Sequence, residues 1–182
     1  MKALFLRSCL ELNKLDRKLY ASGDTLLIFT PLMNEPPAAN FATFDTRNAH
    51  PELDFDATTE EKAVFTGIMP RHYGGGGVTN TLFWTGGTAT SGTCVWQTAF
   101  ERIGTVLDID ADSFATGNNG TTAAGTTTGT VTSTAIAHTD GAQMDSLAVG
   151  ELFRIAVTRE VADAQDSMGG DAGLMGIEIK ET

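Results

Sequence analysis

The chain has 182 residues and a mass of 19.2 kDa, with 12 basic and 23 acidic side chains and a net charge of -11. This length suits one domain, and the acidity excludes general nucleic-acid binding, because phosphate contacts depend on Lys and Arg. Charged residues make up 19% of the chain, below the usual quarter, so Thr, Ser, Asn and Gly supply much of the polar surface. That composition favours strands and turns over helices.

The two cysteines, Cys9 and Cys94, lie far apart and in no CxxC spacing, which excludes a zinc or redox motif of that kind. A disulfide between them stays open, but the apolar surroundings of Cys94 favour a small buried side chain. No stretch approaches the roughly 18 apolar residues of a membrane span. The apolar run at residues 3–6 is too short for a signal-peptide core, so we expect a protein used without secretion.

Charge is unevenly distributed along the chain. Residues 1–20 carry +3, so the remaining 162 residues carry -14. Apolar side chains between Phe5 and Leu19 recur at helical spacing, which predicts a basic amphipathic arm or short helix over residues 1–22 and an acidic body over residues 23–182. The arm packs on its own domain, docks on an acidic partner subunit or lies on a membrane surface. The arm residues predicted to bind a partner are Lys2, Phe5, Arg7, Leu12, Leu15, Arg17 and Lys18.

The first half of the body predicts short strands. Residues 25–30 are apolar and end at Pro31, and the prolines within residues 31–40 indicate a connection. Residues 41–56 alternate with period two, so that Leu53 and Phe55 face one way and the acids between them the other. A further strand is expected over residues 61–68.

Two aromatic strands are expected in the middle of the chain. Residues 78–84 and 94–102 alternate, and the eight or so turn-forming residues between them predict a hairpin. Trp84 and Trp96 are interpreted as core anchors. Before them, Met69 and Tyr73 flank a run of four glycines, and either self-association or a monomer core explains them.

The last third of the chain contains a segment of biased amino-acid composition and two clear strands. Residues 105–114 predict a short strand, residues 115–130 a mobile loop or solvated ribbon, and residues 126–134 an extended row of threonines. A turn and short helix over residues 140–147 precede strands at residues 151–159 and 174–180. Eight to ten short strands with unequal loops predict an all-β jelly-roll or Greek-key sandwich.

No catalytic or cofactor motif is present. His50, His72 and His138 lie in three different segments and in no HExxH pattern. The glycine run at residues 74–77 lacks the Lys and Ser/Thr of a phosphate-binding loop, and GxSxG is absent. We therefore predict no catalytic residues, no cofactor and a protein that is not an enzyme.

A calcium loop is also rejected. Asp108 begins a pattern of alternating acids, but Ser113 and Asn119 stand where an EF-hand needs Gly and a bidentate Glu. A weaker cation site at these acids, or at the acids of residues 52–56, stays open beside the interpretation as solvated strand faces. The prediction for the whole chain is that no metal is bound.

Five segments resemble a group of small β-rich structural proteins of tailed bacteriophages and prophages. They are DTRNAHPELDFD (45–56), TGIMPRHYGGGG (66–77), LFWTGGTATSGTCVWQTAFERI (82–103), LDIDADSFA (107–115) and GAQMDSLAVGELFRIAVTREV (141–161). The resemblance covers residues 41–182 and implies a trimeric, jelly-roll-like virion component. No functional residue of the group is transferred.

The expected function is a non-enzymatic virion protein of a tailed bacteriophage: a trimeric capsid decoration, cement or head-fibre protein anchored by its arm. Its partners are itself and the major capsid protein or another virion protein, with no nucleic acid or membrane. It is made in the host bacterial cytoplasm and resides in the virion. The alternative is a tail or baseplate-associated module that binds host-surface carbohydrate, with Tyr73 as an exposed aromatic. Self-association is assigned to Met69 and Tyr73.

Overall fold

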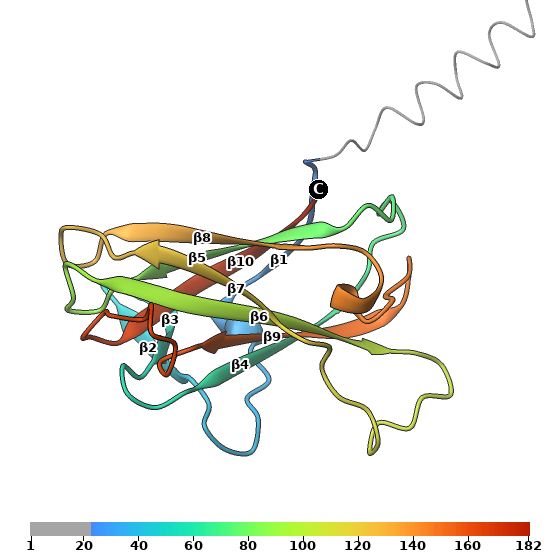
Figure 1. The fold of residues 1–182 in the computed structure, drawn as a ribbon, viewed down its shortest axis with the longest axis horizontal. Coiled ribbons are helices and arrows are strands. Elements are labelled where there is room, and N and C mark those ends of the chain that lie inside the picture. The colour runs from blue at the N-terminus through green and yellow to red at the C-terminus, as the bar shows by residue number, and fades with distance from the viewer. Residues whose placement is uncertain (1–22) are drawn as a thin grey trace, which may run out of the picture.

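Two antiparallel sheets pack face to face in the computed structural model, which describes residues 23–182 (Figure 1). Sheet A has the order β2-β3-β10-β5-β8, and β1 also pairs with β10. Sheet B has the order β4-β9-β6-β7. The prediction of an all-β sandwich with jelly-roll crossovers is confirmed, whereas the predicted arm lies outside the described residues.

Residues 23–182 form ten strands of 5 to 11 residues and two single 3-10 turns. The strands are β1 (Thr25–Phe29), β2 (Thr43–Arg47), β3 (His50–Phe55), β4 (Lys62–Ile68), β5 (Val78–Thr85), β6 (Thr93–Ile103), β7 (Asn118–Ala123), β8 (Val131–His138), β9 (Leu152–Arg159) and β10 (Ala172–Glu181); the turns are η1 (Pro31–Met33) and η2 (Ala142–Met144).

The hairpin predicted from the two aromatic strands is wrong. β5 pairs with β8 and β10 in sheet A, whereas β6 pairs with β7 and β9 in sheet B. The connection between them, which includes Gly87 and Gly92 at positive φ, crosses from one sheet to the other. As a result Trp84 and Trp96 meet across the core, with ring centroids 5.9 Å apart. Two tryptophans bury more apolar surface between sheets than on one face of a hairpin.

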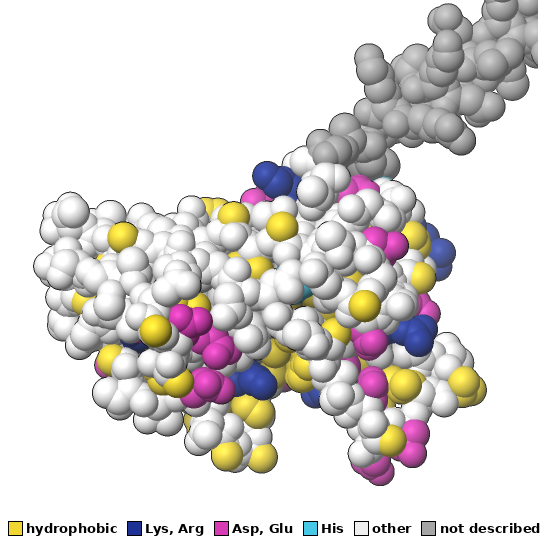
Figure 2. Space-filling model, viewed as in Figure 1, with side chains coloured by type: hydrophobic (Ala, Val, Ile, Leu, Met, Phe, Trp, Pro, Cys, Tyr) yellow, Lys and Arg dark blue, Asp and Glu magenta, His cyan; other side chains and the backbone are white. Residues whose placement is uncertain are grey.

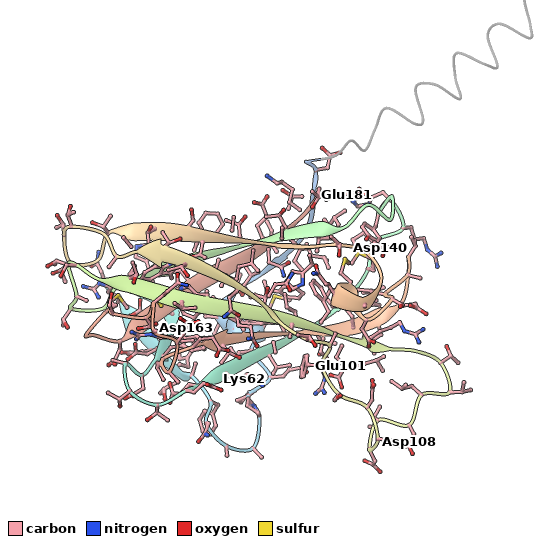
Figure 3. The ribbon with its side chains drawn as sticks, in the orientation of Figure 1. Lys62, Glu101, Asp108, Asp140, Asp163 and Glu181 are labelled. Carbon is pink, nitrogen blue, oxygen red and sulfur yellow. The ribbon has the colours of Figure 1, made fainter. Side chains whose placement is uncertain are left out.

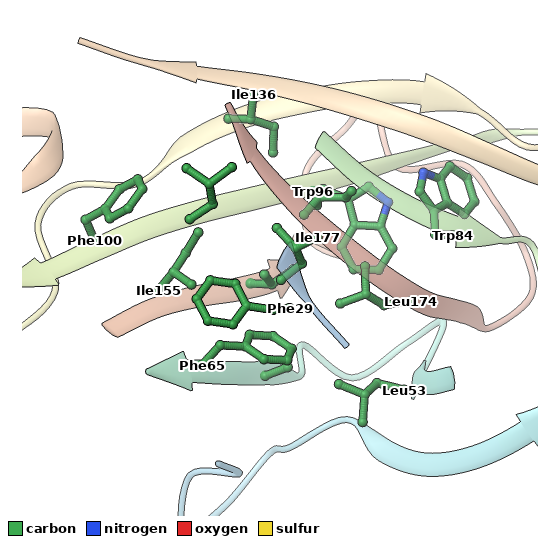
Figure 4. Close-up of a cluster of buried hydrophobic side chains, with 14 of the residues drawn as sticks. Phe29, Leu53, Phe65, Trp84, Trp96, Phe100, Ile136, Ile155, Leu174 and Ile177 are labelled. Carbon is green, nitrogen blue, oxygen red and sulfur yellow. The ribbon is translucent and has the colours of Figure 1, made fainter. Parts of the chain in front are cut away.

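The core lies between the sheets and is rich in aromatic rings (Figure 4). Phe29 of β1, Phe65 of β4 and Phe153 of β9 form one group, with the Phe29 and Phe65 centroids 5.6 Å apart. The predicted roles of Trp84 and Trp96 as core anchors are confirmed, since both are fully buried. Cys94 is also fully buried, as its apolar surroundings predicted.

Three local predictions need correction. Residues 105–114 form turns without a strand, and β7 lies inside the segment predicted as a loop or ribbon. The threonine-rich strand starts later, at Val131. β7 forms because β6 supplies its hydrogen-bonding partners, with Val95 opposite Thr121. That pairing is long-range, so the composition of residues 118–123 carries little sign of it.

The alternating residues 43–55 form a hairpin of β2 and β3. Arg47 of β2 pairs with His50 of β3, and the two residues between them, Asn48 and Ala49, both have positive φ. Two consecutive residues of this kind make the tight turn that suits the right-handed twist of a hairpin. The turn places Arg47, Asn48 and His50 together at one end of sheet A.

Candidate functional site

The outer face of sheet B is covered by the chain that follows β6. The ring of Phe114 packs against two cations, with its centroid 5.8 Å from Lys62 Nζ and 5.2 Å from the Arg154 guanidinium carbon. Arg154 also pairs with the buried carboxylate of Glu101 at 2.5 Å. The Ala115 amide donates to the Phe100 carbonyl of β6. These contacts cover the part of sheet B around Lys62, Glu101 and Arg154.

The outer face of sheet A carries many small polar side chains along β5 and β8. Along β5, Leu82 and Trp84 point into the core, so Phe83 and Thr85 point outward. Phe83 is 39% exposed and lies opposite Ser133 of β8. On the face of the molecule drawn in Figure 2, charged side chains occupy a minor part of the surface.

A groove of about 450 Å³ opens between the β2–β3 turn and the outer face of sheet A. Arg47 crosses one end, where its Nη1 donates to the Gly87 carbonyl at 2.7 Å. Among residues 23–182, Arg102, Arg154 and Arg159 form ion pairs, and the carboxylates in these pairs do not contact Arg47. The groove is lined by Arg47, Asn48, His50, Thr85, Gly129, Val131 and Met175.

Carboxylates gather beside this groove. Glu52 is buried over Gly173, and its Oε2 accepts a hydrogen bond from the Thr85 hydroxyl at 3.3 Å. Burial, assisted by nearby acids of which Asp171 contributes most, raises the pKa of Asp54 to about 6. The outer face of sheet A therefore combines one cation in the groove with a negative potential next to it.

A second open surface, the apolar edge, is defined by Leu32, Met33, Phe41 and Phe44. These four side chains are 73%, 45%, 44% and 49% exposed. Leu32, Phe41 and Phe44 line a groove of about 320 Å³, with Leu53 of the core also contacting it. Phe44 lies opposite Leu53 in the β2–β3 ladder. Exposed apolar clusters of this kind mark interaction surfaces.

The described residues contain no cluster of side chains placed to bind a metal ion. No group of three or more His, Cys, Asp or Glu side chains among residues 23–182 is placed to hold a metal ion. Figure 3 shows Glu101, Asp108, Asp140 and Glu181 dispersed, with Asp108 on a loop that extends from the body. None of the helical turns in this part of the chain is long or apolar enough to span a membrane.

The structure gives a core role to the two residues assigned to self-association. Met69 is fully buried, and Tyr73 is 5% exposed with its hydroxyl accepting from the Gly77 amide at 3.2 Å. Of the two alternatives open from the sequence, burial favours the monomer core. Tyr73 as an exposed glycan-binding aromatic is a wrong prediction, because a buried ring cannot stack on a sugar. The predicted arm residues lie outside the described chain.

The groove residues were missed as a group by sequence reasoning. Arg47, Asn48 and His50 are separated in sequence from Thr85 by more than thirty positions and from Met175 by more than a hundred. The one local signal was the Asn at the β2–β3 turn, since Asn tolerates the left-handed conformation that such turns need. His138, which lies in no ligand motif of the sequence, is buried between the sheets.

Comparisons with known proteins add structural neighbours and no family. No family model and no curated protein matches the chain. Similar solved structures include the CBM22-2 xylan-binding domain of Xyn10C from Paenibacillus barcinonensis, with a TM-score of 0.47 and 11% identity over 82% of this chain and 92% of that domain. The CBM22-1 domain of the same protein gives a TM-score of 0.47 and 10% identity over 88% and 96%. We assign no ligand or function from likenesses this distant.

Proposed function

We propose that this chain is a non-enzymatic structural protein of a tailed-bacteriophage virion, acting as a homotrimeric capsid decoration, cement or head-fibre protein. The observation that carries the proposal is the apolar edge, where the exposed side chains of Leu32, Phe41 and Phe44 line one groove and Met33 lies next to Leu32 on an acidic body. Clusters of large apolar side chains are expected where a subunit packs against another. The resemblance of residues 41–182 to phage structural proteins supports the same role.

Attachment is assigned to the N-terminal arm. Residues 1–20 carry +3 and the rest of the chain -14, so the arm is complementary to an acidic partner. The partners proposed are other copies of this chain, through the apolar edge, and the major capsid protein or another virion protein, through the arm. Synthesis takes place in the host bacterial cytoplasm and the mature location is the virion.

Incorporation into particles tests the attachment. Full-length chains carrying Arg17→Glu and Lys18→Glu should be recovered with purified particles at a small fraction of the wild-type amount, because the arm then repels an acidic partner. A chain lacking residues 1–20 should behave in the same way while its body stays folded by circular dichroism. Undiminished incorporation of both variants would contradict the role of the arm.

Sedimentation tests self-association through the apolar edge. The wild-type protein should sediment as a trimer, and the double variant Leu32→Ser, Phe44→Ser as a monomer. Phe83→Ser is the matched control, since it removes an exposed aromatic from the outer face of sheet A. A monomeric wild type, or a trimer unaffected by the double variant, contradicts this part of the proposal.

The alternative virion role is a tail or baseplate-associated module that binds carbohydrate on the host surface. The observation that favours it is the groove of about 450 Å³ on the outer face of sheet A, which offers both polar and apolar lining groups. Particle location by cryo-electron microscopy separates the two roles: density on the capsid supports decoration, and density on the tail or baseplate supports host binding.

A further inference from the structure

We propose that the groove on the outer face of sheet A is a binding site for a neutral saccharide. The inference goes beyond the decoration role and does not depend on it, because a capsid protein and a tail protein can both present such a site. Its volume of about 450 Å³ lies within the range of roughly 300–1,000 Å³ found for small-ligand sites. If the chain has the alternative host-binding role, the groove is where that binding takes place.

The lining of the groove has two chemically distinct parts. Val131, 51% exposed, and Met175 supply apolar surface on β8 and β10. Asn48 and His50 supply polar groups from the β2–β3 turn, and Thr85, whose hydroxyl donates to Glu52, closes the groove at the end of β5. A sugar ring has the matching pair of features, with an apolar C–H face and a rim of hydroxyl groups.

The polar groups both donate and accept hydrogen bonds. The Asn48 side chain offers an amide donor and a carbonyl acceptor, and the His50 imidazole offers two ring nitrogens for hydrogen bonds. Arg47 donates once to the Gly87 carbonyl, which leaves guanidinium N–H groups for a ligand. Because a hydroxyl group also donates and accepts, a polyol satisfies this set better than a ligand that only accepts.

The charges around the groove argue against an ionic ligand. Arg47 inside the groove disfavours a cation, and the carboxylates of Glu52 and Asp54 on the same face disfavour an anion. The rise in the pKa of Asp54 reflects burial together with this gathering of acids. The chain outside the arm carries a net charge of -14, so the long-range electrostatic field of the body repels acidic sugars.

Phe83 extends the site along sheet A. It points outward two residues before Thr85 on β5, and Met175 lies in the irregular stretch of β10 next to the residue paired with Phe83. Its ring is 39% exposed, and the residue opposite it on β10 is Gly176, which contributes no side chain. Stacking of a second sugar unit on this ring would make the site prefer an oligosaccharide to a monosaccharide.

Titration of the full-length protein with saccharides tests the proposal. The probes are xylo-, gluco-, galacto- and manno-oligosaccharides, and galacturonate oligomers as the acidic set, followed by ¹H–¹⁵N NMR and calorimetry. We expect one or more neutral oligomers to bind with a Kd below about 1 mM and to shift the amide signals of Asn48, His50, Thr85 and Val131. No neutral binding, tighter acidic binding, or shifts confined to another surface would overturn the proposal.

Two matched pairs of variants locate the site. Asn48→Gly removes the amide side chain while keeping a residue that accepts positive φ, and Asn40→Gly makes the same change at the other left-handed asparagine of the described chain. Asn48→Gly should weaken binding at least fivefold and Asn40→Gly less than twofold. Phe83→Ala should weaken oligosaccharide binding, whereas Phe44→Ala on the apolar edge should not. Equal losses of saccharide binding within both pairs contradict the assignment of the groove as the binding site. Particle incorporation is measured separately and reports on the virion role alone.

Discussion

Arg159, at the end of β9, and Asp166, in the following loop, form an ion pair from which solvent is excluded. The Nη2 and Oδ1 atoms are 3.1 Å apart, and the two side chains are 0% and 4% exposed. The guanidinium also donates to the carbonyls of Met168 at 2.7 Å and Gly170 at 2.8 Å. One arginine thus fixes the connection between β9 and β10, and a buried charge of this kind is tolerated because its donors are satisfied.

Removing the carboxylate should be costly. Asp166→Ala leaves the buried guanidinium without its counter-charge and deprives the Val95 amide of its acceptor. We expect the free energy of unfolding to fall by about 3–5 kcal/mol, measured by urea denaturation. Arg102→Gln, which breaks the exposed pair with Glu151, should cost less than about 1 kcal/mol. Similar losses in the two variants would show that burial of the Arg159 pair is not what matters.

Closure of the sandwich at β7 and β8 depends on a glycine. A Cβ atom at Gly120 would lie 2.7 Å from Ile136 Cγ1 and 2.8 Å from Thr134 Cγ2. Gly120→Ala should therefore lower stability by about 1–3 kcal/mol through overpacking. Gly169→Ala is the control, because a Cβ atom there meets nothing within 4 Å. Equal melting temperatures of the two variants by calorimetry would contradict the close approach of the sheets.

Acid should weaken the fold through His138. Its Nε2 lies 2.7 Å from the Thr98 hydroxyl, which also accepts from the Asn80 amide at 3.1 Å. Burial lowers the pKa of His138 from 6.5 to about 4. The unfolded chain therefore binds a proton more readily, so the stability present above pH 6.5 is lost progressively as the pH falls to about 4. The loss is on the order of 3 kcal/mol, since one pKa unit corresponds to about 1.4 kcal/mol.

Histidine ¹H NMR measures the pKa of His138, and urea denaturation between pH 7.5 and 4 measures the loss of stability. The His138 resonance should titrate near pH 4, and His138→Gln should show a smaller fall in unfolding free energy over this range. A His138 resonance that titrates near 6.5, or an unchanged pH dependence in the variant, would contradict the buried neutral state.

Two neighbouring carboxylates should respond in opposite directions to loss of charge. The pKa of Asp54 is raised to about 6, so its stabilising effect exists below pH 3.8 and is lost as the pH rises through 6. Hydrogen bonds from the Thr58 hydroxyl and from the Thr58 and Thr59 amides lower the pKa of Asp56 to about 2. Asp56 therefore stabilises the fold above pH 3.8 and loses that effect as the pH falls through about 2.

At pH 8, Asp54→Asn should raise the melting temperature and Asp56→Asn should lower it. Thermal unfolding at pH 8 and at pH 5 measures both, and the gain from Asp54→Asn should shrink at pH 5, where the wild-type carboxyl is largely protonated. A gain for Asp54→Asn that is the same at both pH values would point to a cause other than charge.

The sequence by itself determined which side chains face the core and where most strands lie. Period-two alternation placed Leu53 and Phe55 inward and identified Trp84 and Trp96 as anchors, because the side-chain direction of a strand is a property of that strand alone. The same local information predicted the fold class, and it contained no catalytic motif.

Tertiary structure alone decided how the strands pair and which surface is open. Whether β5 and β6 form a hairpin or lie in opposite sheets depends on packing against β8, β9 and β10, far away in the chain. The same long-range pairing buried Tyr73 and brought Arg47, Thr85 and Met175 to one groove. A pattern within one segment specifies which face is apolar but not what covers it, and here the covering partner is supplied by residues that can lie more than a hundred positions away.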